Sequence, residues 1–440
     1  MTYQESLHYL NSLINYEKRD SYNYNQSFRL ERMVFIVRTL GDPQKGIPSI
    51  HIAGSKGKGS TSAIIHSILK EAGFRVGLYT SPHLASFRER IRINDDLISE
   101  ADIGRLLEKV RAVTDQMADD PPSFFEAYTA LAFLCFKERS VDFAVYETGL
   151  GGRLDATNVI TPLVEAITPI SYEHTRLLGN TLAEIAGEKC GIIKSGSLCV
   201  SAPQDEEALT VIEDVCRRQG VKLILIGRDI MFEELEASDA KEVFSVDGIF
   251  KRYPRLETKL LGRHQVINSA VAIGVVEGLR SCGVKVSSDA VKKGIENVRW
   301  DGRLEVARRS PYVVLDGAQN KASAQALASA VKKVFRYKRL ILVLGVSKDK
   351  DIAGILAELV PMADAVILTR AGIAERAAAP SAIKDLIAGD HANVMLTGSV
   401  EEAVRKALAS AGTEDMVLIT GSLFVEGEAR PMVTDTVAYA

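Results

Sequence analysis

The feature that most restricts the fold of this chain is a repeated alternation of short apolar runs with amphipathic stretches. The apolar runs in the first half are Ser49–Gly54, Val76–Thr80, Asp142–Glu147, Val164–Ile170 and Leu198–Ala202, and helical patterns begin near Ser60, Glu100, Phe124, Thr181 and Glu206. Strands that alternate with helices in this way are typical of a mostly parallel sheet covered on both faces. We therefore predict an α/β fold.

The same alternation predicts two domains. Residues 228–262 break it with short alternating patches at Glu242–Val246 and Gly248–Lys251, which predict a small antiparallel sheet, and two helices follow at His264–Ser281 and Ser288–Asn297. After a hinge at Arg299–Gly302 the alternation restarts, with strands at Tyr312–Asp316, Leu340–Gly345, Ala365–Thr369, Val394–Thr397 and Val417–Gly421. We predict domains at 1–300 and 301–440, with a ligand in the cleft between them.

Charge, hydropathy and cysteine content exclude several classes of protein. A net charge of −3 gives no support to a nucleic-acid binder, and no apolar run approaches the roughly 20 residues of a membrane span. The N-terminal MTYQESLHYLNSL predicts an amphipathic helix, not a signal peptide. The five cysteines are scattered without CxxC spacing, so neither a zinc cluster nor a disulfide framework is indicated, and a reducing compartment fits best. We expect a cytoplasmic monomer that acts on small molecules, without nucleic-acid or membrane partners.

The most informative short segment is SIHIAGSKGKGST, at residues 49–61. A predicted strand runs into a loop with Gly54, Gly57 and Gly59, and a predicted helix begins at Ser60. Glycines let backbone N–H groups surround an anion, the helix N-terminus adds unpaired donors, and Lys58 adds a full positive charge. The spacing differs from the general GxxxxGK[ST] pattern, and a glycine-rich turn with surface lysines is the alternative. For Lys56 two interpretations stay open: a solvated lysine on the loop, or a lysine that contacts the ligand.

Polar groups after three predicted strands suggest a magnesium site. Ser81, Glu147 and His174 each lie at or just past the carboxyl end of a strand, where side chains point into the ligand crevice of a parallel sheet. Each residue alone is weak evidence, because a single histidine is more often a surface or core residue. Taken from the residues alone, Lys189 is a helical lysine near a C-cap glycine, and Cys190 is a packed residue.

Together these motifs resemble the folylpolyglutamate synthase/dihydrofolate synthase family of the Mur ligase superfamily. The resemblance covers roughly Tyr9 to Arg430, and GLGGRLDATN and SPHLASFRERI are its most specific segments. The matching segments are HIAGSKGKGST (51–61), YTSPHLASFRERIRIN (79–94), FFEAYTALAF (124–133), ETGLGGRLDATNVI (147–160), EHTRLLGNTLAEIAGEKCGIIK (173–194), GRHQVINSAVA (262–272), GRLE (302–305), LDGAQN (315–320) and KDKDI (348–352).

The resemblance implies a P-loop-containing, Mur-ligase-like ATPase domain followed by a smaller Rossmann-like domain. It implies the ATP-dependent joining of L-glutamate to a folate or to dihydropteroate, with two Mg²⁺ ions and K⁺ as an activator. The implied roles are nucleotide binding by Gly57, Lys58, Gly59, Ser60, Asn268, Arg303 and Asp316; metal binding by Ser81, Glu147 and His174; catalysis by Lys58, His174 and a carbamylated Lys189; and pterin-side binding by Phe124, Phe125, Glu126, Leu154, Asp155 and Ala156.

The sequence departs from the family pattern at three places. Ser55-Lys56 stands where the family usually has Thr-Asn, and Glu173 precedes His174 where it usually has Asp. Gln319 stands where the family usually has His, and an amide cannot take up a positive charge. These substitutions keep open the alternative of a nucleotide-binding regulatory protein without catalysis. Another Mur-type amide ligase with a different acyl substrate is the second alternative.

Overall fold

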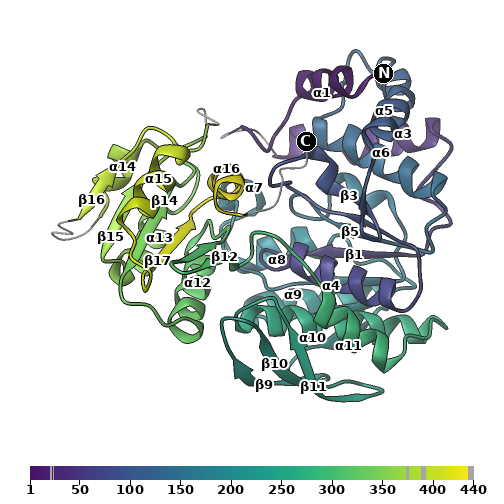
Figure 1. The fold of residues 1–440 in the computed structure, drawn as a ribbon. Coiled ribbons are helices and arrows are strands. Elements are labelled where there is room, and N and C mark those ends of the chain that lie inside the picture. The colour runs from purple at the N-terminus through teal and green to yellow at the C-terminus, as the bar shows by residue number, and fades with distance from the viewer. Residues whose placement is uncertain (20–21, 23, 373–375, 388–392, 435–440) are drawn as a thin grey trace.

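The computed structural model describes residues 1–19, 22, 24–372, 376–387 and 393–434. It has two lobes, which Figure 1 shows side by side. The N-terminal lobe contains all elements up to helix α11, and the C-terminal lobe begins at strand β12. The predicted α/β architecture is confirmed in both lobes.

The N-terminal lobe is built on an eight-stranded sheet in the order β4-β3-β2-β5-β1-β6-β7-β8. Strands β2, β5, β1, β6, β7 and β8, which are neighbours in this order, pair in parallel. Strands β3 and β4 add an antiparallel edge beside β2. The strands are β1 Ser49–Ala53, β2 Val76–Tyr79, β3 Ile91–Ile93, β4 Asp96–Leu97, β5 Phe143–Glu147, β6 Val164–Ile167, β7 Leu198–Ser201 and β8 Lys222–Leu225. Ile52 in central β1 pairs with Glu147 of β5 and Ala166 of β6, so the ends of these strands lie together.

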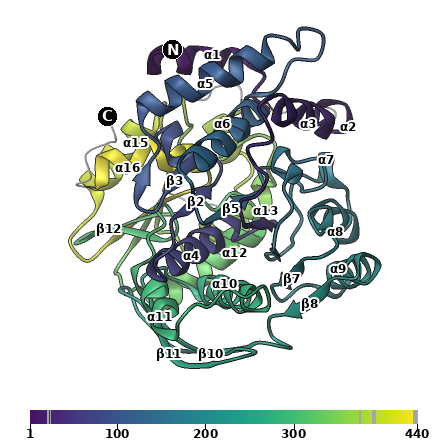
Figure 2. The ribbon, with the colours of Figure 1, turned by 90° about the vertical axis from the view of Figure 1, so that its right-hand side faces the viewer.

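Helices cover both faces of this sheet (Figures 1 and 2). Neighbouring residues of β5 show why both faces are apolar: Val145 belongs to one buried cluster and Tyr146 to the opposite one. Three helices pack on the face of the first cluster: α4 Lys58–Glu71, α10 Arg263–Ser281 and α11 Ser288–Asn297. The opposite face is covered by α1 Tyr3–Ser12, α3 Leu30–Thr39, α5 Glu100–Thr114, α6 Phe124–Glu138, α8 Leu182–Cys190 and α9 Glu206–Gln219. Short helical turns are α2 Tyr24–Ser27, α7 Thr175–Leu178, η1 Phe87–Arg90 and η2 Ala156–Val159.

A three-stranded antiparallel sheet follows, formed by β9 Met231–Ala237, β10 Glu242–Asp247 and β11 Arg252–Thr258. The small antiparallel sheet is therefore confirmed, but the strand predicted at Gly248–Lys251 is wrong. That segment is the turn between β10 and β11, closed by the Gly248 N–H, which donates to the Lys251 carbonyl over 2.9 Å. The turn before β10 reaches the C-terminal lobe, where the Tyr312 hydroxyl donates to Asp239 over 2.8 Å.

The C-terminal lobe has a six-stranded sheet in the order β12-β13-β17-β14-β15-β16, parallel except for β12. Its strands are β12 Glu305–Arg309, β13 Tyr312–Leu315, β14 Leu340–Leu344, β15 Ala365–Leu368, β16 Val394–Leu396 and β17 Met416–Thr420. One face packs on α12 Lys321–Val334 and α13 Ile352–Leu359, with η3 Val360–Met362, and the other on α15 Val400–Ser410 and α16 Leu423–Val433; α14 Pro380–Lys384 lies near β15 and β16.

Two further observations concern the whole chain. Among the described residues, no helix has both the length and the apolar character that crossing a bilayer requires. All five cysteines are free thiols, and Cys282 is the exposed one.

Candidate active site

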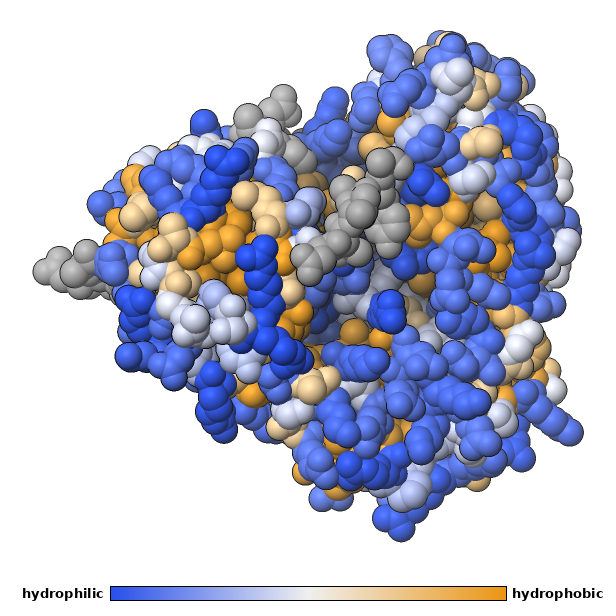
Figure 3. Space-filling model, viewed as in Figure 1, coloured by the Kyte–Doolittle hydropathy of each residue, from blue (hydrophilic) through white to orange (hydrophobic). Residues whose placement is uncertain are grey.

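A cavity of about 570 Å³ lies between the two lobes, and Figure 3 shows the hollow there. Residues from the carboxyl ends of the central strands of the N-terminal lobe line one side, and residues from the C-terminal lobe line the other. The cavity lies where open α/β sheets bind their ligands. Most of the residues that the sequence predicts for the site line this one cavity.

The glycine-rich loop at residues 54–59, the phosphate loop, leaves the end of β1 and enters α4, as predicted. Two glycines are required by close contacts: a Cβ at Gly54 would lie 1.9 Å from Thr168 Oγ1, and one at Gly57 would lie 2.2 Å from Asn268 Oδ1. Gly57 also has a φ of +82° and caps α4 without a side-chain hydrogen bond. The first turn of α4 therefore keeps its N–H donors for a bound anion. The helix begins at Lys58, two residues earlier than predicted.

The other predicted nucleotide residues of the N-terminal lobe lie around this loop. Lys58 and Ser60 line the cavity, and the Lys58 ammonium donates to the Gly54 carbonyl over 3.2 Å. Asn268 on α10 also lines the cavity, and its amide donates to Gln265 over 2.9 Å. A Cβ at Gly59 would lie 2.9 Å from the indole of Trp300, so the loop contacts the predicted hinge directly.

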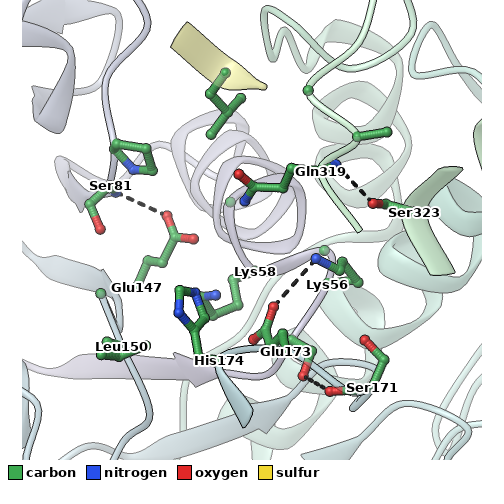
Figure 4. Close-up of a pocket in the computed structure, with 18 of the residues that line it drawn as sticks. Lys56, Lys58, Ser81, Glu147, Leu150, Ser171, Glu173, His174, Gln319 and Ser323 are labelled. Carbon is green, nitrogen blue, oxygen red and sulfur yellow. Dashed lines mark hydrogen bonds and ion pairs between the residues drawn. The ribbon is translucent and has the colours of Figure 1, made fainter. Parts of the chain in front are cut away.

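The three predicted metal ligands also line the cavity. Ser81 follows β2, Glu147 ends β5, and the Ser81 N–H donates to the Glu147 carboxylate over 3.2 Å (Figure 4). His174 follows β6 with a left-handed φ of +46°. Burial lowers the pKa of His174 to about 3, so its imidazole is neutral near pH 7 and can offer a lone pair.

These residues fit a magnesium ion that keeps most of its ligands from water and phosphate. Glu147 is 4% exposed, and burial raises its pKa to about 7 against the opposing charge of Lys58, so a cation beside it would stabilise the carboxylate. Among the described residues, no group of three or more His, Cys, Asp and Glu side chains is gathered for metal binding. Mg²⁺ is commonly held by one or two carboxylates together with substrate phosphates, which agrees with this arrangement.

Lys189 lies in the same cavity, on α8, and its side chain is 1% exposed. Its ammonium donates to the Gly54 carbonyl over 2.8 Å and to Glu173 Oε1 over 3.0 Å. Burial lowers the pKa of Lys189, although Glu173 opposes the change. Lys56 contacts the other carboxylate oxygen, with its Nζ 3.3 Å from Glu173 Oε2, as Figure 4 shows. Lys56, for which the sequence left two interpretations open, thus lies in the cavity.

Arg303, just before β12, and Asp316 and Gln319 of the C-terminal lobe line the same cavity. Asp316 accepts the N–H groups of Leu304 over 2.9 Å and Ala318 over 2.8 Å. Burial raises the pKa of Asp316, while the Arg303 guanidinium opposes this.

Of the predicted pterin-side set, Phe125 lines the cavity, whereas Phe124, Glu126, Leu154, Asp155 and Ala156 do not. Each of these five has a structural role. Phe124 is 1% exposed in the core, Leu154 and Ala156 pack in apolar clusters, Glu126 pairs with Arg32 over 2.9 Å, and Asp155 accepts the Gly149 and Leu150 N–H groups.

Sequence reasoning missed an aromatic group on the cavity wall. Tyr16, Tyr22 and Phe28 line the cavity, and their ring centroids lie 4.7 to 5.8 Å apart. The signal was present in YEKRDSYNYNQSF, which has four aromatic residues within thirteen positions between two helices. Lys350 and Arg376 of the C-terminal lobe, which both pair with Asp349, were missed as well.

Comparison with known proteins places this site in a family. The Mur ligase middle domain matches residues 52–276, and the glutamate ligase domain of Mur ligases matches residues 302–423. The dihydrofolate synthase/folylpolyglutamate synthase of Bacillus subtilis is 38% identical over 408 residues, which cover 91% of this chain and 94% of that protein.

Solved structures agree. The folylpolyglutamate synthase of Mycobacterium tuberculosis complexed with ADP matches with a TM-score of 0.89 and 32% identity, over 99% of this chain and 98% of that one. Escherichia coli FolC in complex with DHPP and ADP matches with a TM-score of 0.86 and 29% identity, over 98% of each chain. The chain therefore belongs to the folylpolyglutamate synthase/dihydrofolate synthase family of the Mur ligase superfamily.

Proposed function

We propose that this protein is an ATP-dependent ligase that joins L-glutamate to the carboxylate of a folate, of dihydropteroate, or of both. The observation that carries the proposal is the convergence of the phosphate loop, Glu147, His174 and Lys189 with Arg303 and Asp316 in one cavity. The similarity to ADP-bound structures of family members supports ATP as the nucleotide. We also propose 1–300 and 301–440 as the two domains.

The chemistry explains why these groups are needed. A carboxylate is a poor electrophile, so its oxygen first attacks the γ-phosphorus of ATP, which gives an acyl phosphate and ADP. The glutamate α-amine then attacks the acyl carbon, the carbon–oxygen bond to phosphate breaks, and the nitrogen loses a proton as the amide and inorganic phosphate form. The first transfer needs positive charge around the phosphates and in-line positioning. Lys58, the N–H groups of α4 and Arg303 are placed to supply that charge.

Magnesium neutralises phosphate charge when it is bound. In this proposal the Ser81 hydroxyl, the Glu147 carboxylate and the His174 imidazole are the metal ligands. We propose two magnesium sites in total. K⁺ as an activator stays a prediction. So do the monomeric state and the cytoplasmic location.

Lys189 is proposed to act as a carbamate. The ammonium loses a proton, the nitrogen lone pair attacks the carbon of CO₂, and the nitrogen loses a second proton to solvent as the anion forms. A free lysine amine normally carries a positive charge near neutral pH, whereas the carbamate carries a negative charge. The modification therefore changes a cation 2.8 Å from the phosphate-loop carbonyl of Gly54 into an anionic ligand for the metal.

We place the aromatic part of the acceptor against Tyr16, Tyr22 and Phe28, because flat rings pack well on aromatic side chains. Phe125 and Leu150 line the same cavity from the N-terminal lobe.

One assay panel tests the proposal. ADP release is measured with L-glutamate and with dihydropteroate, tetrahydrofolate or tetrahydrofolate diglutamate as the acceptor. We expect release that needs both glutamate and at least one acceptor, and the pattern identifies the preferred acceptor. If a folded protein that binds ATP releases no ADP with any of the three acceptors, the result would contradict the proposal and favour a regulatory role. Amide formation with another acid alone would favour a different Mur-type ligase.

A further inference from the structure

Two lysines of the cavity share the carboxylate of Glu173. The Lys189 Nζ forms an ion pair with Glu173 Oε1 at 3.0 Å, and the Lys56 Nζ forms one with Glu173 Oε2 at 3.3 Å. Lys189 and Glu173 are largely shielded from water, with side-chain exposures of 1% and 11%, and Lys56 is partly exposed at 26%. Figure 4 shows Lys56 and Glu173 pointing toward each other from two different loops.

Counting charges shows why the second lysine matters. With Lys189 as an ammonium, the three side chains carry two positive charges and one negative charge. Once Lys189 is a carbamate, Glu173 faces an anion, and two like charges in a shielded site repel strongly. Lys56 is then the remaining cation of the three and the one already bonded to Glu173.

The structure brings the two lysines to Glu173 from different parts of the chain. Lys56 lies in the glycine-rich loop, 117 residues before Glu173, and Lys189 lies on α8, 16 residues after it.

We propose that Lys56 is a positioning residue for the carbamate of Lys189. It holds Glu173 by Oε2, and when Lys189 takes up CO₂ the Glu173 carboxylate gives up Lys189 and keeps its bond to Lys56. The negative charge of Glu173 is thereby neutralised away from the new anion. This inference rests on the carbamylation of Lys189 in the proposed function.

The test compares wild type with K56Q, E173Q, the double variant K56Q/E173Q and the charge-preserving K56R. K45Q is the matched control, because Lys45 forms an exposed ion pair with Asp42 over 2.8 Å. Each protein is depleted of CO₂ and titrated with ¹³C-bicarbonate. The carbamate is followed by its ¹³C NMR signal and by ligase activity, and KM for ATP is measured at saturating bicarbonate. Circular dichroism verifies that each variant is folded.

We expect K56Q to need at least tenfold more bicarbonate than wild type for half-maximal carbamate and activity, with KM for ATP within twofold of wild type. K56R should stay within threefold of wild type, and K45Q should match it. In the E173Q background, the K56Q change should have less than a threefold effect, because no second anion remains to be neutralised.

Three results would overturn the inference. The first is an unchanged bicarbonate titration in K56Q. The second is the same loss from K56Q with and without E173Q. The third is an effect confined to KM for ATP, which would make Lys56 a phosphate ligand. A wild type with ligase activity but no ¹³C carbamate signal would overturn the inference and the Lys189 carbamate together, and leave the ligase function standing. Absence of ligase activity with every acceptor in the panel, alongside a normal carbamate signal, would count against the proposed function alone.

Discussion

At the scale of single residues, the site contains buried charged side chains, and some of them are paired by the protein while others are not. Burial alone would raise the pKa of Glu173, but the ammonium groups of Lys189 and Lys56 lower it well below its usual value. Glu147 has no cation at ion-pair distance among the described residues, and burial raises its pKa although the more distant Lys58 opposes the change. The difference separates a carboxylate already neutralised by the protein from one that is suited to an incoming cation.

Lys189 gives the first prediction at this scale. Lys189→Ala should lose at least a hundredfold in ligase activity, because it removes the proposed anion from the metal site. Short carboxylates such as acetate or formate should restore part of the loss by occupying the space of the missing carbamate. Activity of the variant equal to wild type, measured by ADP release with saturating substrates, would disprove the role.

A second residue-level prediction concerns Glu165, which is buried on β6 and accepts the Ser197 hydroxyl over 2.5 Å. Burial raises its pKa to about 7, so between pH 4.5 and 7 the folded protein keeps a proton that the unfolded chain has lost. The free energy of unfolding therefore falls as the pH rises through this window, by up to about 1.4 kcal/mol per pH unit from this group.

Glu165→Gln cannot lose this proton, so its stability should fall less between pH 5 and pH 8, with a difference of ~2 kcal/mol from wild type. Urea unfolding at the two pH values measures it. Glu233→Gln, at an exposed position of β9, is the matched control and should follow wild type. Parallel pH curves for wild type and Glu165→Gln would show that the carboxyl group is already ionised at pH 5.

At the scale of elements, the strand–loop–helix unit of β1 and α4 organises the site. Gly57 and Gly73 both have a left-handed φ, +82° and +91°, but a Cβ at Gly57 would collide with Asn268 while Gly73 has open space around it. Both substitutions by alanine should cost stability of about 1–2 kcal/mol from the backbone. Gly57→Ala should additionally raise the Kd for ATP at least tenfold, measured by calorimetry, whereas Gly73→Ala should leave it within twofold. Equal Kd values would show that the loop tolerates the side chain.

The elements also show how far the sequence could predict the fold. Long apolar runs such as 142–147 and 164–170 were found because both faces of those strands are buried. Strands β3 and β4 were missed because they have only three and two residues. Strands β8 and β12 were missed because they lie at sheet edges, where part of each strand is exposed. The phosphate-loop residues and Lys189 could be located in one cavity from motifs. For Phe124 and Asp155 the motif does not show that the first side chain lies in the core and that the second accepts hydrogen bonds from its own loop.

At the scale of the whole molecule, residues of both lobes line the site, so we expect the lobes to move closer together when the substrates bind. The predicted hinge is coupled to the phosphate loop, because Trp300 packs on Gly59 and the Arg92 guanidinium lies 5.8 Å from its ring centroid. ATP and the folate acceptor together should slow amide hydrogen exchange at residues 299–303 at least threefold, more than either ligand alone. Exchange that the two ligands leave unchanged would contradict closure at this hinge.

The central claim is that the γ-phosphoryl group of ATP passes to the carboxylate of the acceptor in this cavity. It is tested most directly with an acceptor whose carboxylate oxygens are ¹⁸O. The account predicts that, as the glutamyl amide forms, the released inorganic phosphate carries one ¹⁸O atom per turnover, which mass spectrometry detects. Amide formation with unlabelled phosphate would contradict an acyl phosphate and with it the mechanism proposed for this site.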